Sequence, residues 1–67
     1  MITEHGYPIV ESFLVEYNRY IVRVQREGHL HNHVVWNMTE DGRCTNGSYF
    51  ATPEEAKKCF DLRKEAA

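Results

Sequence analysis

The feature that most constrains the fold is a helix-start signal close to the end of the chain. Thr52 can accept a hydrogen bond from the first unpaired amides of a helix, Pro53 suits the first helical position, and Glu55 is placed to complete a capping box. Basic residues near the chain end suit the negative end of a helix dipole. The sequence therefore predicts one helix over residues 53–65.

This predicted helix has only a narrow apolar stripe. Ala56, Cys59 and Phe60 form the stripe, with Leu62 beside it. Because most helices depend on packing for their stability, such a stripe must be buried against another element. We expect the helix to lie on a β-sheet.

The preceding residues 9–51 have the pattern of an antiparallel β-meander. Residues 20–26 alternate in the period of a half-buried strand. Thr39-Glu40-Asp41-Gly42 is a turn signal, and Asn46-Gly47 indicates a bulge or a second turn further on. The predicted fold class is α+β, with an antiparallel three- or four-stranded β-meander packed against one C-terminal α-helix.

A chain of 67 residues is expected to form a single domain over residues 1–67 with one hydrophobic core, because so short a chain buries only about 60% of its unfolded surface. Residues 1–8 are expected to be a lead-in to the meander. No signal peptide and no run of about 20 apolar residues occurs. We therefore expect a cytoplasmic protein without a membrane partner.

Two cysteines, Cys44 and Cys59, are too few for the disulfide framework of small secreted domains. We expect both thiols to be reduced, and a Cys44–Cys59 bridge is the alternative.

Arginine side chains supply the main candidates for a binding surface. We expect Tyr20, Val22 and Val24 to face the core, so that the residues alternating with them face outward. If Ile21, Trp36 or Tyr49 also faces outward beside the arginines, the surface has the composition of a binding hot spot. The alternative is that these arginines are only solvated. The candidate partner-binding residues are Arg19, Ile21, Arg23, Gln25, Arg26 and Arg43.

The histidine run His29, His31 and His33 would bring three imidazoles to one side of an extended strand, as a zinc site requires. A cysteine or water could be the fourth ligand. The alternative is an exposed loop, and the paired C-x-x-C spacing typical of zinc sites does not occur. We therefore predict no metal site and no cofactor.

No constellation of residues indicates an enzyme. Ser12 and Ser48 lie in strand-like segments, and neither a nucleophile elbow nor a Gly-rich phosphate loop occurs. The neighbouring carboxylates Glu40-Asp41 and Glu54-Glu55 are explained by a turn and by a helix start. We expect a protein without catalytic activity.

The stretch Gly47-Ser48-Tyr49-Phe50-Ala51-Thr52-Pro53-Glu54-Glu55-Ala56, followed by Phe60-Asp61, resembles the last strand and helix start of plant ethylene-response-factor DNA-binding domains and their phage relatives. The arm-binding domains of phage integrases also consist of a three-stranded sheet on a helix. The resemblance implies this fold and a sheet that contacts DNA. The chain differs from these families at Glu11 and Glu16, where they carry an arginine-rich first strand, and residues 34–50 hold an extra hairpin.

Two functions are compatible with these observations. The first is a protein-binding module, such as an inhibitor or adaptor encoded by a phage or mobile element, for example an inhibitor of a host defence system. It would dock on a larger protein through the arginine-bearing sheet face or an exposed strand edge, and such an edge could also make a homodimer. The alternative is a duplex-DNA-binding domain that uses Arg19, Arg23, Arg26 and Arg43. The net charge of −2 provides no overall attraction to DNA, so protein binding is the expected function.

Overall fold

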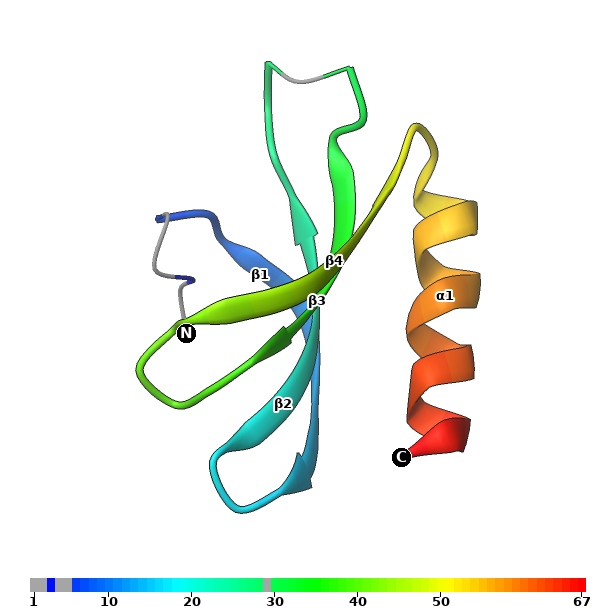
Figure 1. The fold of residues 1–67 in the computed structure, drawn as a ribbon. Coiled ribbons are helices and arrows are strands. Elements are labelled where there is room, and N and C mark those ends of the chain that lie inside the picture. Colours follow the sequence, from blue (N-terminus) through cyan, green and yellow to red (C-terminus); the bar gives the residue numbers. More distant parts are fainter. Residues whose placement is uncertain (1–2, 4–5, 29) are drawn as a thin grey trace.

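Four antiparallel strands in meander order precede a single helix (Figure 1). The computed structural model describes residue 3, residues 6–28 and residues 30–67. The sheet order is β1-β2-β3-β4, which confirms the predicted α+β class and gives the meander its full four strands. The elements are β1 (Ile9–Glu16), β2 (Arg19–Gln25), β3 (His33–Met38), β4 (Cys44–Phe50) and α1 (Pro53–Ala66).

Residues with positive φ make the tight turns between strands. The loop between β1 and β2 consists of Tyr17 and Asn18, and Asn18 has a φ of 61°. Its Oδ1 accepts a hydrogen bond of 2.7 Å from the backbone amide of Glu40, so the first turn is tied to the turn between β3 and β4. Gly42, with a φ of 90°, closes that second turn as predicted.

A bulge interrupts β4 at Asn46-Gly47, which confirms the predicted irregularity. The register passes from Val35 opposite Ser48 to Asn37 opposite Thr45, so two residues of β4 lie opposite Trp36 alone. A Cβ on Gly47 would lie only 2.5 Å from Trp36 Nε1. The bulge therefore depends on a residue without a side chain.

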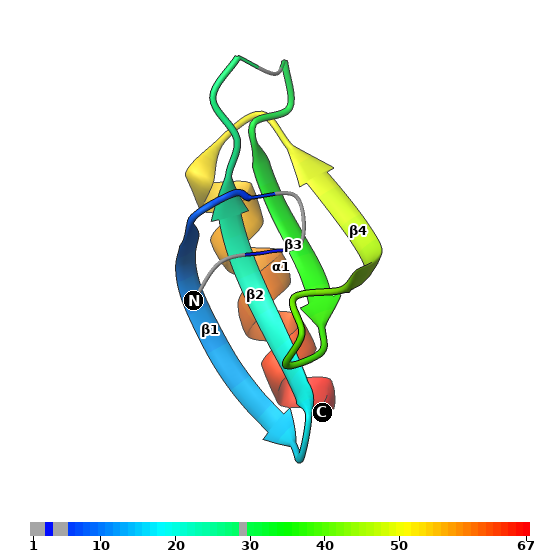
Figure 2. The same ribbon diagram turned by 90° about the vertical axis from the view of Figure 1, so that its left-hand side faces the viewer.

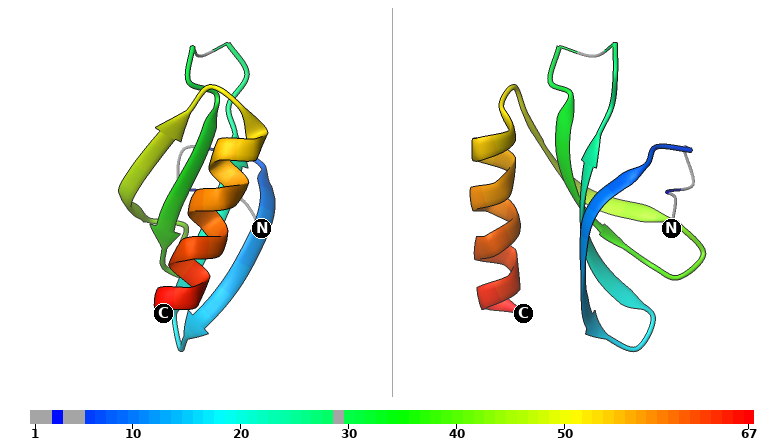
Figure 3. Two further views of the ribbon diagram at one scale, coloured as in Figure 1. Left: turned by 90° about the vertical axis from the view of Figure 1, so that its right-hand side faces the viewer. Right: turned by 180° about the vertical axis from the view of Figure 1, so that it is seen from behind.

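Helix α1 begins as its capping residues predict. The Thr52 hydroxyl accepts a hydrogen bond of 3.3 Å from the Glu55 amide and donates one of 3.0 Å to the Glu55 carboxylate. The helix lies along one face of the sheet, packed on β2, β3 and β4, while β1 and β4 extend to either side of it (Figures 1 and 3).

The sheet divides the buried side chains into two clusters, so the expectation of one core is wrong. The helix-side cluster consists of Ile21, Val35, Ala56 and Phe60. The far-side cluster, on the face away from α1, consists of Val22, Val24, Val34, Trp36 and Met38. Strands β2 and β3 are therefore buried on both faces, like the strands of a sheet covered on two sides.

The far side of the sheet is covered by residues 6–8 and by aromatic rings. Residues 6–8 pass in front of β2 and β3 in Figure 2. The ring of Tyr7 stacks on Trp36 at 6.3 Å between centroids, and Tyr49 meets Trp36 edge-on at 6.1 Å. Thr3 is buried, and its hydroxyl accepts a hydrogen bond of 3.2 Å from the Tyr7 amide. The described residues of the lead-in, Thr3 and residues 6–8, are therefore part of the packed structure.

Candidate functional site

The arginine-bearing side of β2 is the side that α1 covers. Ile21 is only 4% exposed and packs in the helix-side cluster. Arg23 lies on the same side, two residues along the strand, and its side chain is 17% exposed. The prediction that Ile21 and Arg23 face outward is therefore wrong, because β2 is a central strand with a covering layer on each face.

The charge of Arg23 is neutralised inside the molecule. Its Nε donates a hydrogen bond of 3.1 Å to one carboxylate oxygen of Glu11, and Lys57 Nζ donates one of 2.8 Å to the other. The hydrogen bond from Lys57 holds the pKa of Glu11 below its ordinary value of 4.5, although burial acts in the opposite direction. The same bond raises the pKa of Lys57 above 10.5. This three-residue network ties the edge strand β1 to β2 and α1.

The other predicted binding residues do not gather on one surface. Arg19 forms an ion pair with Glu16 at the β1–β2 turn. Arg43 is exposed in the β3–β4 turn at the same end of the sheet, whereas the exposed Gln25 and the half-buried Arg26 lie at the opposite end of β2. The predicted set is thus divided between the two ends of the sheet and its helix-covered face.

Arg26 is held by aromatic rings on the far side. Its guanidinium carbon lies 5.0 Å from the centroid of the Tyr49 ring and 6.0 Å from that of Tyr7. It also donates a hydrogen bond of 3.0 Å to the backbone carbonyl of His31. Tyr49 is exposed, but it lies opposite Val34 on the far side, away from Arg23. Because Ile21 and Trp36 are buried, no hot spot forms beside Arg23.

The histidine run falls only partly within the described structure. His29 lies outside the described residues, His31 lies in the loop before β3, and His33 is the first residue of that strand. Among the residues that the structure describes, no group of three histidine, cysteine or acidic side chains is placed to hold a metal ion. Cys44 packs against the far-side cluster and Cys59 against the helix-side cluster, so the sheet separates the two thiols and they do not form a bridge.

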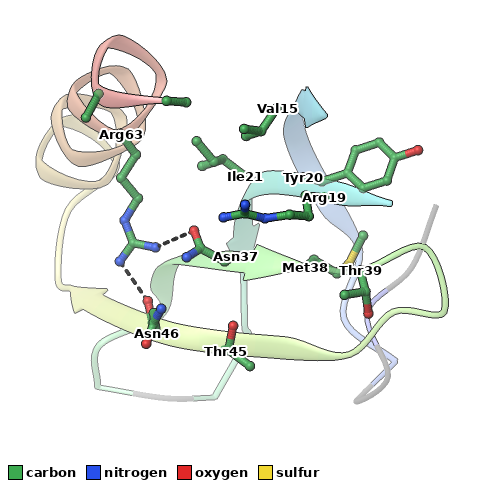
Figure 4. Close-up of a pocket in the computed structure, with 12 residues that line it drawn as sticks. Val15, Arg19, Tyr20, Ile21, Asn37, Met38, Thr39, Thr45, Asn46 and Arg63 are labelled. Carbon is green, nitrogen blue, oxygen red and sulfur yellow. Dashed lines mark hydrogen bonds between the residues drawn. The ribbon is translucent and has the colours of Figure 1, made fainter. Parts of the chain in front are cut away.

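An open groove of about 460 Å³ lies between the last turn of α1 and the adjoining ends of the strands (Figure 4). Arg63 reaches across it and donates hydrogen bonds to Asn37 Oδ1 at 3.1 Å and to the Asn46 carbonyl at 2.7 Å. A third bond, of 2.8 Å, goes to the hydroxyl of Ser48. Because its donors are used in this way, Arg63 fastens α1 to the β4 bulge.

The outer strand β1 presents apolar side chains to solvent. Among the described residues, seven large apolar side chains are exposed, and four of them belong to β1 and the turn that follows it. We call these four the β1 apolar edge. They are Val10 (52% exposed), Phe13 (39%), Leu14 (55%) and Tyr17 (89%).

The two sides of β1 both contribute to this edge. Phe13 lies opposite Ile21 and therefore faces the helix side, where Lys64 Nζ lies 5.6 Å from its ring centroid. Leu14 lies opposite Tyr20 and faces the far side. The pairing with β2 is regular from Glu11 to Leu14 and irregular on either side of that stretch. A partner at this edge would therefore meet apolar groups on both faces of one regular strand segment.

No match was found among protein-family models, curated proteins or solved structures. The resemblance to ethylene-response-factor and integrase arm-binding domains therefore stays a prediction. Within the described part of the chain, no helix combines the length and apolar character that crossing a membrane requires.

Sequence reasoning missed the β1 apolar edge, although a signal was present. The first strand of a meander lies at an edge of its sheet. Residues 9–15 carry apolar side chains at both odd- and even-numbered positions, which point to opposite faces of a strand. A strand that is apolar on both sides and paired on one edge only leaves part of that surface uncovered. The alternation in β2 drew the prediction to that strand instead.

Proposed function

We propose that this chain is a non-catalytic protein-binding module that docks on a larger protein partner through the β1 apolar edge. The observation that carries the proposal is the concentration of exposed apolar side chains along an outer strand. Natural sheets usually protect such strands with charges, bulges or covering segments, because an open apolar edge pairs readily with another chain. An edge left in this state is best explained as an interface.

Docking would combine main-chain and side-chain contacts. A strand of the partner, laid beside β1, would hydrogen-bond to the backbone groups that β1 does not use with β2. Phe13 on the helix side and Leu14 on the far side would then both lose contact with water. Tyr17, beyond the end of the strand, would add a large aromatic contact of the kind enriched at interface hot spots.

The titratable groups support a role without catalysis. A hydrogen bond from Lys57 lowers the pKa of Glu11, and one from Thr39 lowers the pKa of Asp41. The pKa of Lys57 itself is raised. Each of these shifts favours the ordinary charged form. A carboxylate or a lysine that acts as a general acid or base near neutral pH needs a shift in the opposite direction, so these three groups are not suited to that role.

The positions of the arginines favour a protein partner over duplex DNA. A DNA-reading sheet needs several cationic groups aimed at one groove or phosphate row. Here Arg23 is neutralised beneath α1, Arg26 lies among tyrosines, and Arg19 is paired with Glu16. We propose further that the protein acts in the cytoplasm, as an inhibitor or adaptor of the kind that phages and mobile elements encode.

Two leucines of equal exposure provide the test. Leu14 on β1 is 55% exposed and Leu62 on α1 is 56% exposed, so Leu14→Lys and Leu62→Lys place the same charge on different surfaces. Each variant and the original chain, carrying the same affinity tag, would be used to capture partners from source-cell lysate. We expect one protein to be captured by the original chain and by Leu62→Lys but reduced at least about 10-fold with Leu14→Lys.

A crosslinking experiment identifies the contact directly. A photoreactive amino acid at position 14 should form a covalent adduct with the captured protein, and one at position 62 should not. Capture that is equal for the two lysine variants, or adducts formed only from position 62, would refute the β1 site.

A further inference from the structure

We infer that, when the larger partner is absent, the β1 apolar edge is occupied by β1 of a second copy of this chain. The inference rests on the proposed function for the identity of the docking edge, and it adds a regulatory step. The resting protein would be a homodimer, and the partner would have to displace one copy in order to bind. The argument comes from the symmetry, side chains and charges of β1.

Symmetry restricts how two β1 strands can pair. An antiparallel pair related by a two-fold axis normal to the sheet places both α1 helices on the same face of a continuous eight-stranded sheet. Side chains of residues that lie opposite each other must then point to the same face of the sheet. Because side chains alternate along a strand, a residue can lie opposite the same residue of the other copy but not opposite its neighbour, so the two-fold axis must pass beside a residue. The regular segment Glu11 to Leu14 offers Ser12 and Phe13 as interior centres.

The side chains favour a pairing centred on Phe13. The two Phe13 rings would lie directly opposite each other on the helix side, which makes an aromatic cross-strand pair. On the far side, Leu14 of each copy would lie opposite Ser12 of the other, and the small serine leaves space for the leucine. Both pairs cover apolar surface that is exposed in the single chain.

Charges allow this pairing. Glu11 of one copy would face Val15 of the other, so no two carboxylates of this segment lie directly opposite each other. Lys64, which lies over the Phe13 ring, has Asp61 at 3.7 Å, so this cation is accompanied by its own counter-charge. Helix α1 packs mainly on β2, β3 and β4, which leaves room at β1 for the second copy (Figure 3).

The expected affinity is low, as displacement by a partner requires. A contact made by one strand and a few side chains is smaller than a standard protein interface. We expect a dissociation constant roughly between 1 µM and 1 mM. Such a dimer forms at high local concentration and exchanges readily.

Sedimentation equilibrium over a wide concentration range tests the inference. The weight-average mass should rise from 7.9 kDa toward twice that value, and Leu14→Lys should weaken association at least about 10-fold, while Leu62→Lys should not. Circular dichroism would verify that both variants are folded. A mass that stays at the monomer value up to about 1 mM, or equal association by the two variants, would overturn the inference.

Disulfide trapping tests the register. In a background with Cys44→Ser and Cys59→Ser, Phe13→Cys should crosslink rapidly under mild oxidation, because directly opposite Cα atoms lie about 4.5–5.5 Å apart, within disulfide reach. Ser12→Cys is the control, since a pairing centred on Phe13 leaves its two copies roughly 8 Å apart. Faster crosslinking of Ser12→Cys would contradict the proposed centre.

The two proposals fail in different ways. If the chain stays monomeric while partner capture still depends on Leu14, the homodimer is refuted and the docking edge stands. If Leu14 controls self-association but not capture, the docking edge for the larger partner is refuted. If both depend on Leu14, adding purified partner to the dimer should release monomer, and a stable complex of partner with intact dimer would contradict displacement.

Discussion

The two outer strands of the sheet, β1 and β4, differ in the groups that lie along their open edges. Strand β4 is interrupted by the Asn46-Gly47 bulge, and Arg63 from α1 donates hydrogen bonds to the Asn46 carbonyl and the Ser48 hydroxyl. Strand β1 instead exposes apolar side chains, including Phe13 and Leu14, on both of its faces. A bulge and a covering cation are devices that keep a sheet edge from pairing with other chains. Strand β1 also has register irregularities, between Ile9 and Glu11 and between Leu14 and Glu16, but the segment between them is regular and carries exposed apolar side chains. The two edges therefore differ mainly in the apolar surface that they expose.

Chain order explains part of this difference. Helix α1 follows β4 directly, so its last turns can place Arg63 over the neighbouring strand. Strand β1 is tied to the helix by the hydrogen bond from Lys57 to Glu11, and its Val15 packs against the helix-side cluster. These contacts hold β1 in the sheet without covering its outer edge.

The largest expected effect comes from filling the space at the β4 bulge. In Gly47→Ala, the new methyl group would lie 2.5 Å from Trp36 Nε1 and 2.8 Å from the Tyr49 hydroxyl oxygen. Because Trp36 is only 6% exposed and has little room to move, we expect the free energy of unfolding to fall by about 2–3 kcal/mol. Urea denaturation measures the loss. Thr45→Ala, at an exposed site on the same strand, is the control, and an equal loss there would show that the close contact is unimportant.

The next effect tests whether Arg63 protects β4. Arg63→Met keeps much of the side-chain length but removes three hydrogen bonds, so we expect a loss of about 1–2 kcal/mol. Amide exchange in β4 should become faster, and self-association should increase through the newly opened edge. Lys64→Met, which removes an ion pair with Asp61 and contacts of the ammonium group with the Phe13 and Phe60 rings but none of these hydrogen bonds, should cost less. If amide exchange in β4 is the same in Arg63→Met as in the original chain, Arg63 does not protect the edge of β4.

The smallest effect concerns the charged attachment of β1. The pKa of Glu11 is lower in the folded chain than its ordinary value of 4.5, so its charge stabilises the fold at neutral pH, and this contribution is lost as the pH falls through the folded value. Glu11→Gln should therefore be less stable at pH 7, and the difference from the original chain should shrink below pH 4.5. Urea denaturation at several pH values, with Glu40→Gln as the control, would measure this. A difference that does not depend on pH would contradict the proposed ion pair.

The helix and the strand order could be predicted because their signals are local. Thr52, Pro53 and Glu55 determine the helix start by contacts within one turn, and the chain order of a meander requires no long-range information. The bulge was also visible, since Asn46-Gly47 interrupts an otherwise extended segment.

The face that α1 covers could not be derived from alternation alone, because β2 and β3 are apolar on both sides. Ile21 and Val35 pack under the helix, while the neighbouring Val22 and Val34 pack on the far side. Their adjacency is itself the signature of a strand buried on two faces. The second cover, supplied by Tyr7 and other aromatic groups, comes from distant parts of the chain, so no short pattern specified it.

Amide hydrogen exchange, measured residue by residue on the protein at low concentration and again with its captured partner, tests the central claim most directly. We predict that the partner slows exchange in residues 9–16 of β1 and leaves residues 44–50 of β4 unchanged. Protection that appears in β4 or on the exposed side of α1, with β1 unaffected, would contradict the claim that β1 is the docking edge.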